Sequence, residues 1–184
     1  VTWTAVRFVS AALPVLRERG GRVVIVGSMV GSVALPYHGA YSAAKAGLDG
    51  YADALRREVA SRGVEVALVE PGPVRTGFNE RAAAAVEAAD GEGPYADAYR
   101  AFEGYSPAAT GVETVVERVV TATVADRPRA RYRVSRRARW LPRLARVLPD
   151  RLDHRLVRAA PPGGVPWGVL PRRLAGVGPT GGAP

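Results

Sequence analysis

The sequence predicts an α/β fold in which helices cover a parallel sheet. Two short β-branched runs, residues 22–28 (RVVIVGS) and 64–72 (VEVALVEPG), lack the polar/apolar alternation of a strand with one solvated face. Such runs are typical of parallel strands that are buried on both sides. Each run follows a segment with helical spacing of its apolar residues, and this alternation of helix and strand predicts right-handed crossovers.

The first helix is predicted over residues 4–18, because its apolar residues recur at helical intervals. Gly20 and Gly21 follow it directly and end it. A second helix is predicted over residues 40–61, and Gly63 ends it. Its first half is rich in alanine and glycine, so another backbone can approach that half closely.

Regular structure is harder to predict after the second strand. Residues 77–110 form a long excursion that we expect to cover or line a site. Residues 111–125 keep their valines at helical spacing, and residues 129–135 (RARYRVS) predict a third strand whose arginines alternate outward. The excursion contains several aromatic residues, which fit an apolar pocket and ordinary core equally well: Phe78, Tyr95, Tyr99, Phe102 and Tyr105.

Three regions are expected along the chain. A folded body covers residues 1–135, and a basic helical extension, broken by Pro142 and Pro149, covers residues 136–160. Residues 161–184 contain 6 Pro and 7 Gly, which predicts a disordered tail.

The positive charge of the chain is concentrated near its C-terminus. The net charge is +9, yet residues 1–126 carry 12 Arg or Lys and 15 Asp or Glu, whereas residues 127–184 carry 14 Arg and 2 Asp. A basic extension of this kind fits a solvated arginine face or a weak contact with an acidic membrane surface through residues 127–159. Nucleic acid is not an expected partner, because only Tyr132 and Trp140 interleave the arginines.

Composition excludes several other classes of protein. The chain has no cysteine, so disulfides and thiolate metal sites are ruled out. Its two histidines, His38 and His154, are far apart and show no ligand pattern, so no metal site is predicted. No apolar run is long enough for a transmembrane helix and no signal peptide is visible, so we expect a cytoplasmic protein.

Tyr41 and Lys45 are the first candidates for chemistry. At positions i and i+4 they share one helix face, and an ammonium beside a phenol lowers the phenol's pKa. A tyrosine tuned in this way exchanges a proton with an alcohol or carbonyl oxygen. Taken alone, the pair also fits an ordinary surface contact. Lys45 is, however, the only lysine among 26 Lys and Arg residues, which argues against a degenerate site.

Polar and turn-forming residues follow both predicted strands. Ser28 ends the first strand, and the second ends in EPGPVRT with Pro71, Gly72 and Thr76. Open α/β sheets bind ligands at the carboxyl edge of their strands, so the Ser28 hydroxyl could hold a substrate oxygen there. The simpler interpretation makes Ser28 a turn residue and Thr76 a helix N-cap.

Together these stretches resemble the short-chain dehydrogenases/reductases. The resemblance lies in VVIVGSMVG with Ser28, in YSAAK with Tyr41 and Lys45, and in VEPGPVRTGF, in matching order and spacing. It implies a Rossmann-like fold and reversible reduction of a ketone or aldehyde to an alcohol. The implied cofactor is NAD or NADP. We take NADP as the working choice, although no residue in this chain discriminates between the two.

The resemblance also assigns roles to individual residues. It implies that Tyr41 is the acid/base, that Lys45 lowers the Tyr41 pKa and binds the nicotinamide ribose, and that Ser28 polarises the carbonyl. Tyr41 therefore also lies against the cofactor. Pro71, Gly72 and Val74 would line the nicotinamide pocket, and Thr76 would contact the carboxamide or the diphosphate.

The resemblance covers roughly residues 1–135 and implies features that this sequence does not show. These are a glycine-rich nucleotide-binding turn and a relay asparagine near Val1 or Thr2; the only asparagine is Asn79. We therefore expect strands 5, 6 and 7 of a doubly wound sheet, with strand 22–28 at an exposed edge.

The same departures leave three explanations open: a fragment, a truncated paralogue or a degenerate non-enzyme. We expect little activity from the chain alone. In the family, the helices that correspond to residues 4–18 and 40–61 commonly form a dimer interface. Pairing with a second copy or with a full-length homologue is therefore expected, and a non-catalytic dimerisation or membrane-surface protein is the alternative function.

Overall fold

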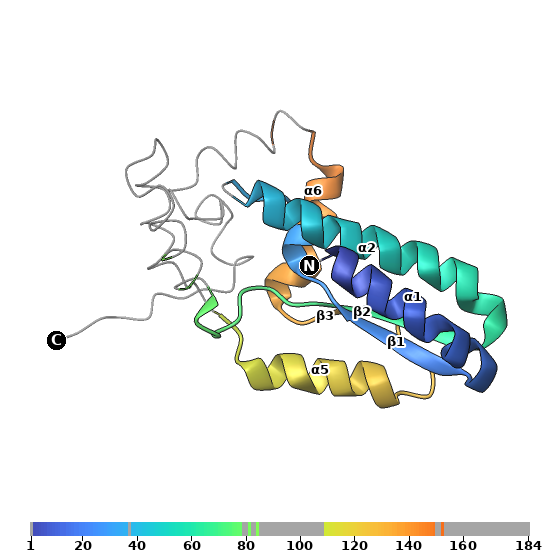
Figure 1. The fold of residues 1–184 in the computed structure, drawn as a ribbon. Helices are drawn as coiled ribbons and strands as arrows, with labels where there is room; N and C mark the ends of the chain where they lie inside the picture. The colour runs from blue at the N-terminus through green and yellow to red at the C-terminus, as the bar shows by residue number, and fades with distance from the viewer. Residues whose placement is uncertain are drawn as a thin grey trace. The chain divides into compact units, whose positions relative to one another are not determined.

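The structure is a computed structural model that describes residues 2–36, 38–78, 81, 84, 109–149 and 152. The chain divides into two compact units, one formed by Val1–Thr76 with Ser106–Val147 and the other by Gly77–Tyr105 with Leu148–Pro184. Of the predicted covering segment over residues 77–110, the structure describes residues 77, 78, 81, 84, 109 and 110. The rest of that segment and the predicted tail over residues 161–184 lie outside the described residues. All the helices and strands below belong to the first unit (Figure 1).

The first unit is α/β, with three parallel strands in the order β1-β2-β3. Its elements are α1 (Thr2–Arg19), β1 (Gly21–Val26), the 3-10 turn η1 (Met29–Gly31), α2 (Gly39–Val59), the 3-10 turn η2 (Ala60–Arg62), β2 (Val64–Glu70), α5 (Val112–Val124), β3 (Arg131–Arg133) and α6 (Arg136–Val147). The predicted fold class, helices around a parallel sheet, is confirmed, and each predicted helix and strand of this unit is present.

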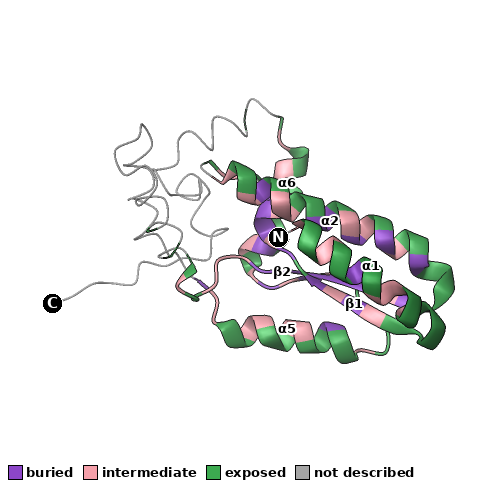
Figure 2. Cartoon of the chain, in the orientation of Figure 1, coloured by how far each residue is buried: buried purple, intermediate pink, exposed green. Residues whose placement is uncertain are grey.

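Helices cover both faces of the sheet, with α1 and α2 on one face and α5 on the other (Figure 1). Successive side chains of a strand point to opposite faces. In β2, Val66 and Leu68 therefore pack with α1 and α2, while Ala67 and Val69 pack with α5. This two-sided burial explains why the apolar run of β2 shows no polar alternation (Figure 2).

β1 lies at the edge of the described sheet, because β2 is its one strand partner there. Val23 and Ile25 are buried in the core shared with α1 and α2. On the other face Val24 is half-buried, and Val26 at the strand end is 46% exposed. The prediction of burial on both faces is confirmed for β2 and holds for only one face of β1.

Glycine follows the helical segments that precede β1 and β2. Gly20 follows α1 with φ +70°, and Gly63 follows η2 with φ +68°. This left-handed conformation favours glycine and is the usual end of a helix. None of the described helices combines the length and apolar character needed to cross a bilayer.

Two predictions about the basic segment are wrong. Arg131 and Arg133 do not point to solvent, because both form ion pairs with the carboxylate of Glu70, at 3.1 and 3.2 Å. Pro142 does not break the helix, since α6 continues through it to Val147. An interior proline removes one N–H and crowds the carbonyl four residues earlier, but Pro142 is fully buried, so its burial can offset that cost.

Candidate functional site

Ser28 lies between β1 and η1, at the carboxyl end of β1. Two backbone hydrogen bonds attach its turn to the end of the neighbouring strand. The N–H of Gly27 donates to the Val69 carbonyl at 2.8 Å, and the N–H of Met29 donates to the Pro71 carbonyl at 2.9 Å. The turns that follow β1 and β2 therefore lie side by side, as expected at the carboxyl edge of a parallel sheet.

Tyr41 and Lys45 occupy the first two turns of α2 and meet Ser28 at that edge. Lys45 Nζ lies 5.8 Å from the centroid of the Tyr41 ring and donates to the Val26 carbonyl at 3.3 Å. The Tyr41 side chain is hydrogen-bonded to that of Ser28. The His38 ring lies edge-on to Tyr41, with centroids 6.4 Å apart. Three of the predicted site residues thus converge.

The pKa of Tyr41 differs from the sequence-based expectation. Burial raises the pKa of Tyr41, and the Ser28 hydrogen bond lowers it only in part. Burial lowers the pKa of Lys45, and the nearby Asp49 carboxylate opposes that shift. That Lys45 lowers the Tyr41 pKa stays a prediction: here its ammonium is directed at a backbone carbonyl, and desolvation of the phenol dominates the shift of the Tyr41 pKa.

Pro71 and Gly72 follow β2 directly and complete this group of residues. A Cβ placed on Gly72 would lie 2.4 Å from Ser135 Oγ, so a side chain at this position would have to displace the Ser135 hydroxyl. Val74 continues from it as an isolated parallel bridge to Thr110. Thr76 is exposed at the end of the first unit. The structure thus brings Pro71 and Gly72 to the end of β1, with Val74 and Thr76 further along the loop.

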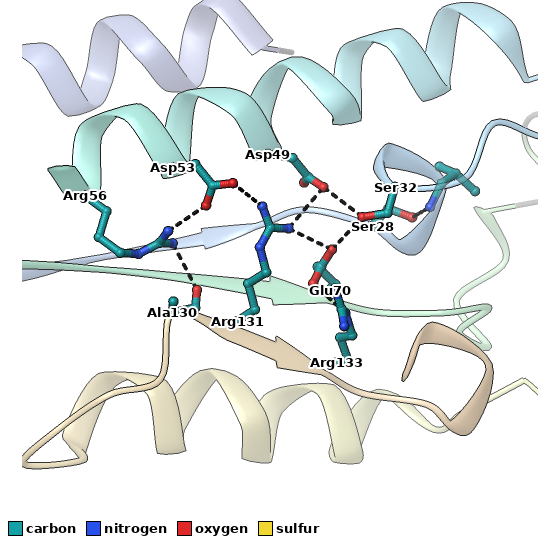
Figure 3. Close-up of polar contacts among 10 residues, drawn as sticks. Ser28, Ser32, Asp49, Asp53, Arg56, Glu70, Ala130, Arg131 and Arg133 are labelled. Carbon is teal, nitrogen blue, oxygen red and sulfur yellow. Dashed lines mark hydrogen bonds and ion pairs between the residues drawn. The ribbon is translucent and has the colours of Figure 1, made fainter. Parts of the chain in front are cut away.

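Sequence analysis missed a cluster of charged residues between α2 and the sheet (Figure 3). The cluster consists of Asp49, Asp53 and Arg56 of α2, Glu70 of β2, and Arg131 and Arg133 of β3. One signal was present in the sequence. Tyr41, Lys45, Asp49 and Asp53 recur every four residues, so a single face of α2 carries all four.

Arg131 is the centre of this charge cluster. Its Nη1 lies 3.1 Å from Glu70 Oε1 and 3.4 Å from Asp49 Oδ2, and its Nη2 lies 2.6 Å from Asp53 Oδ2. One guanidinium therefore joins β3 to both β2 and α2. Ser32, which follows η1, approaches Asp49 and Glu70 as well, at 3.2 and 3.0 Å.

The arrangement places a phenol, an ammonium and a hydroxyl at the carboxyl edge of a parallel sheet. A sequence profile described as "short chain dehydrogenase" matches residues 3–87, which include all three groups and the turn after β2. The chain belongs to the short-chain dehydrogenase family. The family had been expected from the three stretches quoted above, and that expectation is confirmed.

Relatives in the short-chain dehydrogenase family are similar across most of this chain. The "Uncharacterized oxidoreductase YbbO" of Escherichia coli K12 is 33% identical over 148 residues, covering 79% of this chain and 52% of that protein. The "NADPH-dependent 3-dehydrocapnine reductase" of Ornithobacterium rhinotracheale is 32% identical over 141 residues, covering 72% and 48%. The chain thus spans about half the length of these curated relatives.

A solved structure shares the fold of this short-chain dehydrogenase. It is a short-chain dehydrogenase from Burkholderia cenocepacia J2315 in complex with NADP, with a TM-score of 0.61 and 23% identity. The match covers 83% of this chain and 53% of the other.

Proposed function

We propose that this chain carries the proton-transfer site of an NAD(P)-dependent oxidoreductase that interconverts a carbonyl and an alcohol. The convergence of Ser28, Tyr41 and Lys45 at the end of β1 carries the proposal. Ligands of open α/β sheets bind outside the carboxyl ends of the strands. We further assign β1, β2 and β3 to the C-terminal half of the family's doubly wound sheet.

Each of the three side chains has a role at a stated atom. The Ser28 hydroxyl donates a hydrogen bond to the substrate carbonyl oxygen, and Tyr41 Oη gives that oxygen a proton during reduction. A nicotinamide held at this edge of the sheet would supply the hydride for reduction, or accept it in the reverse direction. The phenolate of Tyr41 then recovers its proton from solvent. The Lys45 ammonium, 5.8 Å from the centroid of the Tyr41 ring, stabilises the phenolate electrostatically.

The donor set also fits the nicotinamide ribose. An ammonium has three N–H donors, and Lys45 directs one of them at the Val26 carbonyl, which leaves two for ribose hydroxyls. Pro71 and Gly72 lie at the same sheet edge, beside the Ser28 turn, and Val74 and Thr76 would follow toward the carboxamide and diphosphate. NADP is our first choice, because the Burkholderia structure contains it and the Ornithobacterium relative depends on NADPH.

The sole lysine gives a direct test of cofactor binding. Lysine labelled with 13C at its ε-carbon produces one signal, that of Lys45. We expect millimolar NADPH or NADH to shift this signal in the wild type and in Tyr41→Phe, and whatever reduction of ketones and aldehydes the wild type shows to be lost in Tyr41→Phe. An unmoved lysine signal at saturating concentrations of both nucleotides would contradict the proposal.

A second candidate function is attachment to an anionic membrane surface through α6. The exposed face of this helix carries Arg136, Arg139, Trp140, Arg143, Arg146 and Val147, while Ala138, Leu141 and Pro142 face the fold. Among the described arginines of the basic segment, Arg131 and Arg133 are held by Glu70, whereas four arginines of α6 are exposed. Each such arginine contributes about 1 kcal/mol near an anionic leaflet.

Vesicle binding tests this second function. We expect salt-sensitive binding to phosphatidylserine vesicles but not to phosphatidylcholine vesicles, and loss of binding when Arg139, Arg143 and Arg146 are changed to Gln. A control with the same change of charge replaces the exposed arginines of α1: Arg7, Arg17 and Arg19. Equal losses in both variants, or tighter binding to RNA than to vesicles, would contradict a membrane surface on α6.

A further inference from the structure

The turn that carries Ser28 has to be held against two separate elements. Its backbone is bonded to the end of β2 through Gly27 and Met29. Tyr41 and Lys45, however, belong to α2, which approaches the turn from the side. The backbone bonds to β2 therefore do not set the distance from Ser28 to Tyr41.

Gly31 brings the turn into contact with α2. A Cβ on Gly31 would lie 2.8 Å from the backbone carbon and oxygen of Lys45. Those atoms belong to a helix and cannot move separately, so the close approach requires glycine. The contact limits how near the turn can come, but it supplies no bond that keeps it there.

Ser32 supplies that bond, because its hydroxyl reaches both elements. Ser32 Oγ lies 3.2 Å from Asp49 Oδ2, one helical turn beyond Lys45, and 3.0 Å from Glu70 Oε1, directly before Pro71 (Figure 3). A hydroxyl has one proton to donate. It donates to one carboxylate at any moment, and the other carboxylate stays within hydrogen-bonding distance.

The two acceptors are themselves held in place. Arg131 binds Asp49 and Glu70 with the same Nη1, and Arg133 holds the second oxygen of Glu70 at 3.2 Å. These ion pairs already join α2 to the sheet without Ser32. The hydroxyl therefore adds the attachment of the turn, and little else, to the cluster.

We propose that Ser32 is a positioning residue, whose hydroxyl ties the Ser28 turn to Asp49 and Glu70 and so holds Ser28 within hydrogen-bonding distance of Tyr41. The inference rests on the proposed function for the roles of Ser28 and Tyr41. Its test needs neither cofactor nor turnover, so failure of either proposal can be recognised separately.

The test compares two side chains of the same shape. Ser32→Thr keeps the hydroxyl, and Ser32→Val replaces it with a methyl group. With 13Cζ-labelled tyrosine, the Tyr41 signal is assigned from its absence in Tyr41→Phe and is titrated with pH. The Ser28 hydrogen bond lowers the Tyr41 pKa, so Ser28→Ala defines the midpoint when that bond is lost. Lys45 and His38, the charged and titratable neighbours of Tyr41, are unchanged in every variant.

We expect the Tyr41 midpoint of Ser32→Val to shift upward toward that of Ser28→Ala, and the midpoint of Ser32→Thr to stay at the wild-type value. Asp53→Asn is the control, because Asp53 belongs to the charge cluster and bonds to Arg56 and Arg131 rather than to Ser32. A folded Ser32→Val protein with an unmoved Tyr41 midpoint would overturn the proposal.

A second variant covers loss of folding in Ser32→Val. Asp49→Ala removes one acceptor, and its midpoint should also rise, although loss of a nearby negative charge alone would lower it. A midpoint that falls would overturn the proposal. If neither variant folds, the hydroxyl serves the stability of the whole unit, and the proposal is likewise overturned.

Discussion

Glu70 of β2 and Arg131 of β3 meet on the α2 side of the sheet, with 3.1 Å between Oε1 and Nη1. The Glu70 side chain is 1% exposed, and its other oxygen is held by Arg133. Such a charge is tolerated in a core only when it is paired and hydrogen-bonded. The pair lies directly before Pro71, so it also determines where the turn after β2 begins.

Removing the Glu70 charge should destabilise the first unit. Glu70→Gln keeps the shape of the side chain but removes the carboxylate charge that pairs with Arg133 and with Arg131, which keeps only Asp49 and Asp53. We expect a loss of about 3 kcal/mol in the free energy of unfolding. Urea denaturation measures it. Glu65→Gln on the same strand is the control, because Glu65 pairs with Arg22 but is 42% exposed, and exposed pairs contribute below about 1 kcal/mol. Similar losses of unfolding free energy in Glu70→Gln and Glu65→Gln would contradict the view that the buried Glu70 charge stabilises the first unit.

Asp49 and Asp53 should respond to pH in opposite directions. Burial and the neighbouring Glu70 raise the pKa of Asp49 above 3.8. The folded state then holds its proton more tightly than the unfolded state, so this residue's contribution to stability falls as pH rises above 3.8. Burial also acts on Asp53, but bonds from Arg56 and Arg131 outweigh it and lower its pKa below 3.8. Its contribution is present above 3.8 and is lost as pH falls below that value.

Asn variants at these two positions separate the effects. We expect the unfolding free energy of the wild type, minus that of Asp49→Asn, to decrease with rising pH across the acidic range. The same difference for Asp53→Asn should increase. Chemical denaturation at several pH values measures both, and parallel curves would show that the two carboxylates have similar environments.

Glycine at position 31 should be required for space rather than for backbone conformation. Gly31→Ala would place a Cβ 2.8 Å from the α2 backbone at Lys45, and overpacking of this kind costs about 1–3 kcal/mol. Gly50→Ala, with nothing within 4 Å of the new Cβ, should instead stabilise α2 by about 0.5–1 kcal/mol. Thermal unfolding measures both, and a stabilised Gly31→Ala would contradict the close approach.

We propose that the chain pairs with a second copy through α1 and α2. Phe8 and Val15 of α1 are 76% and 54% exposed, an unfavourable amount of solvated apolar surface for a monomer. We expect Phe8→Glu to weaken self-association at least about tenfold, or 1.4 kcal/mol, in sedimentation experiments. Val124→Glu, at a 70% exposed position of α5 on the other side of the sheet, should have no effect. A wild type that stays monomeric at all concentrations would rule the pairing out.

The local features of this fold could be predicted from sequence because they depend on neighbouring residues. The 3.6-residue spacing of apolar residues identified α1, α2 and α5, and unbroken β-branched runs identified β1 and β2. Tyr41 and Lys45 share a helix face by spacing alone. Ser28 and Pro71 each follow a parallel strand, so their meeting at one sheet edge was predictable as well.

Long-range relationships were not predictable, because spacing within a strand does not say which face of it will be buried. Arg131 and Arg133 share one side of β3 because they are two residues apart. Only the packing of that side against α2 placed both of them beside Glu70. The link from Ser32 to Asp49 joins residues that are 17 positions apart. The direction of the Tyr41 pKa shift depends on burial in the assembled fold, which outweighed the lysine one turn away.

Secondary structure, fold class and the candidate residues thus follow from the order of the amino acids, since local periodicity and turn chemistry act over a few residues. The partners of the charges, the close contact at Gly31 and the desolvation of Tyr41 arise only when α2 packs on the sheet. Electrostatic energies depend on distance and solvent exposure, and both are properties of that packing rather than of position along the chain.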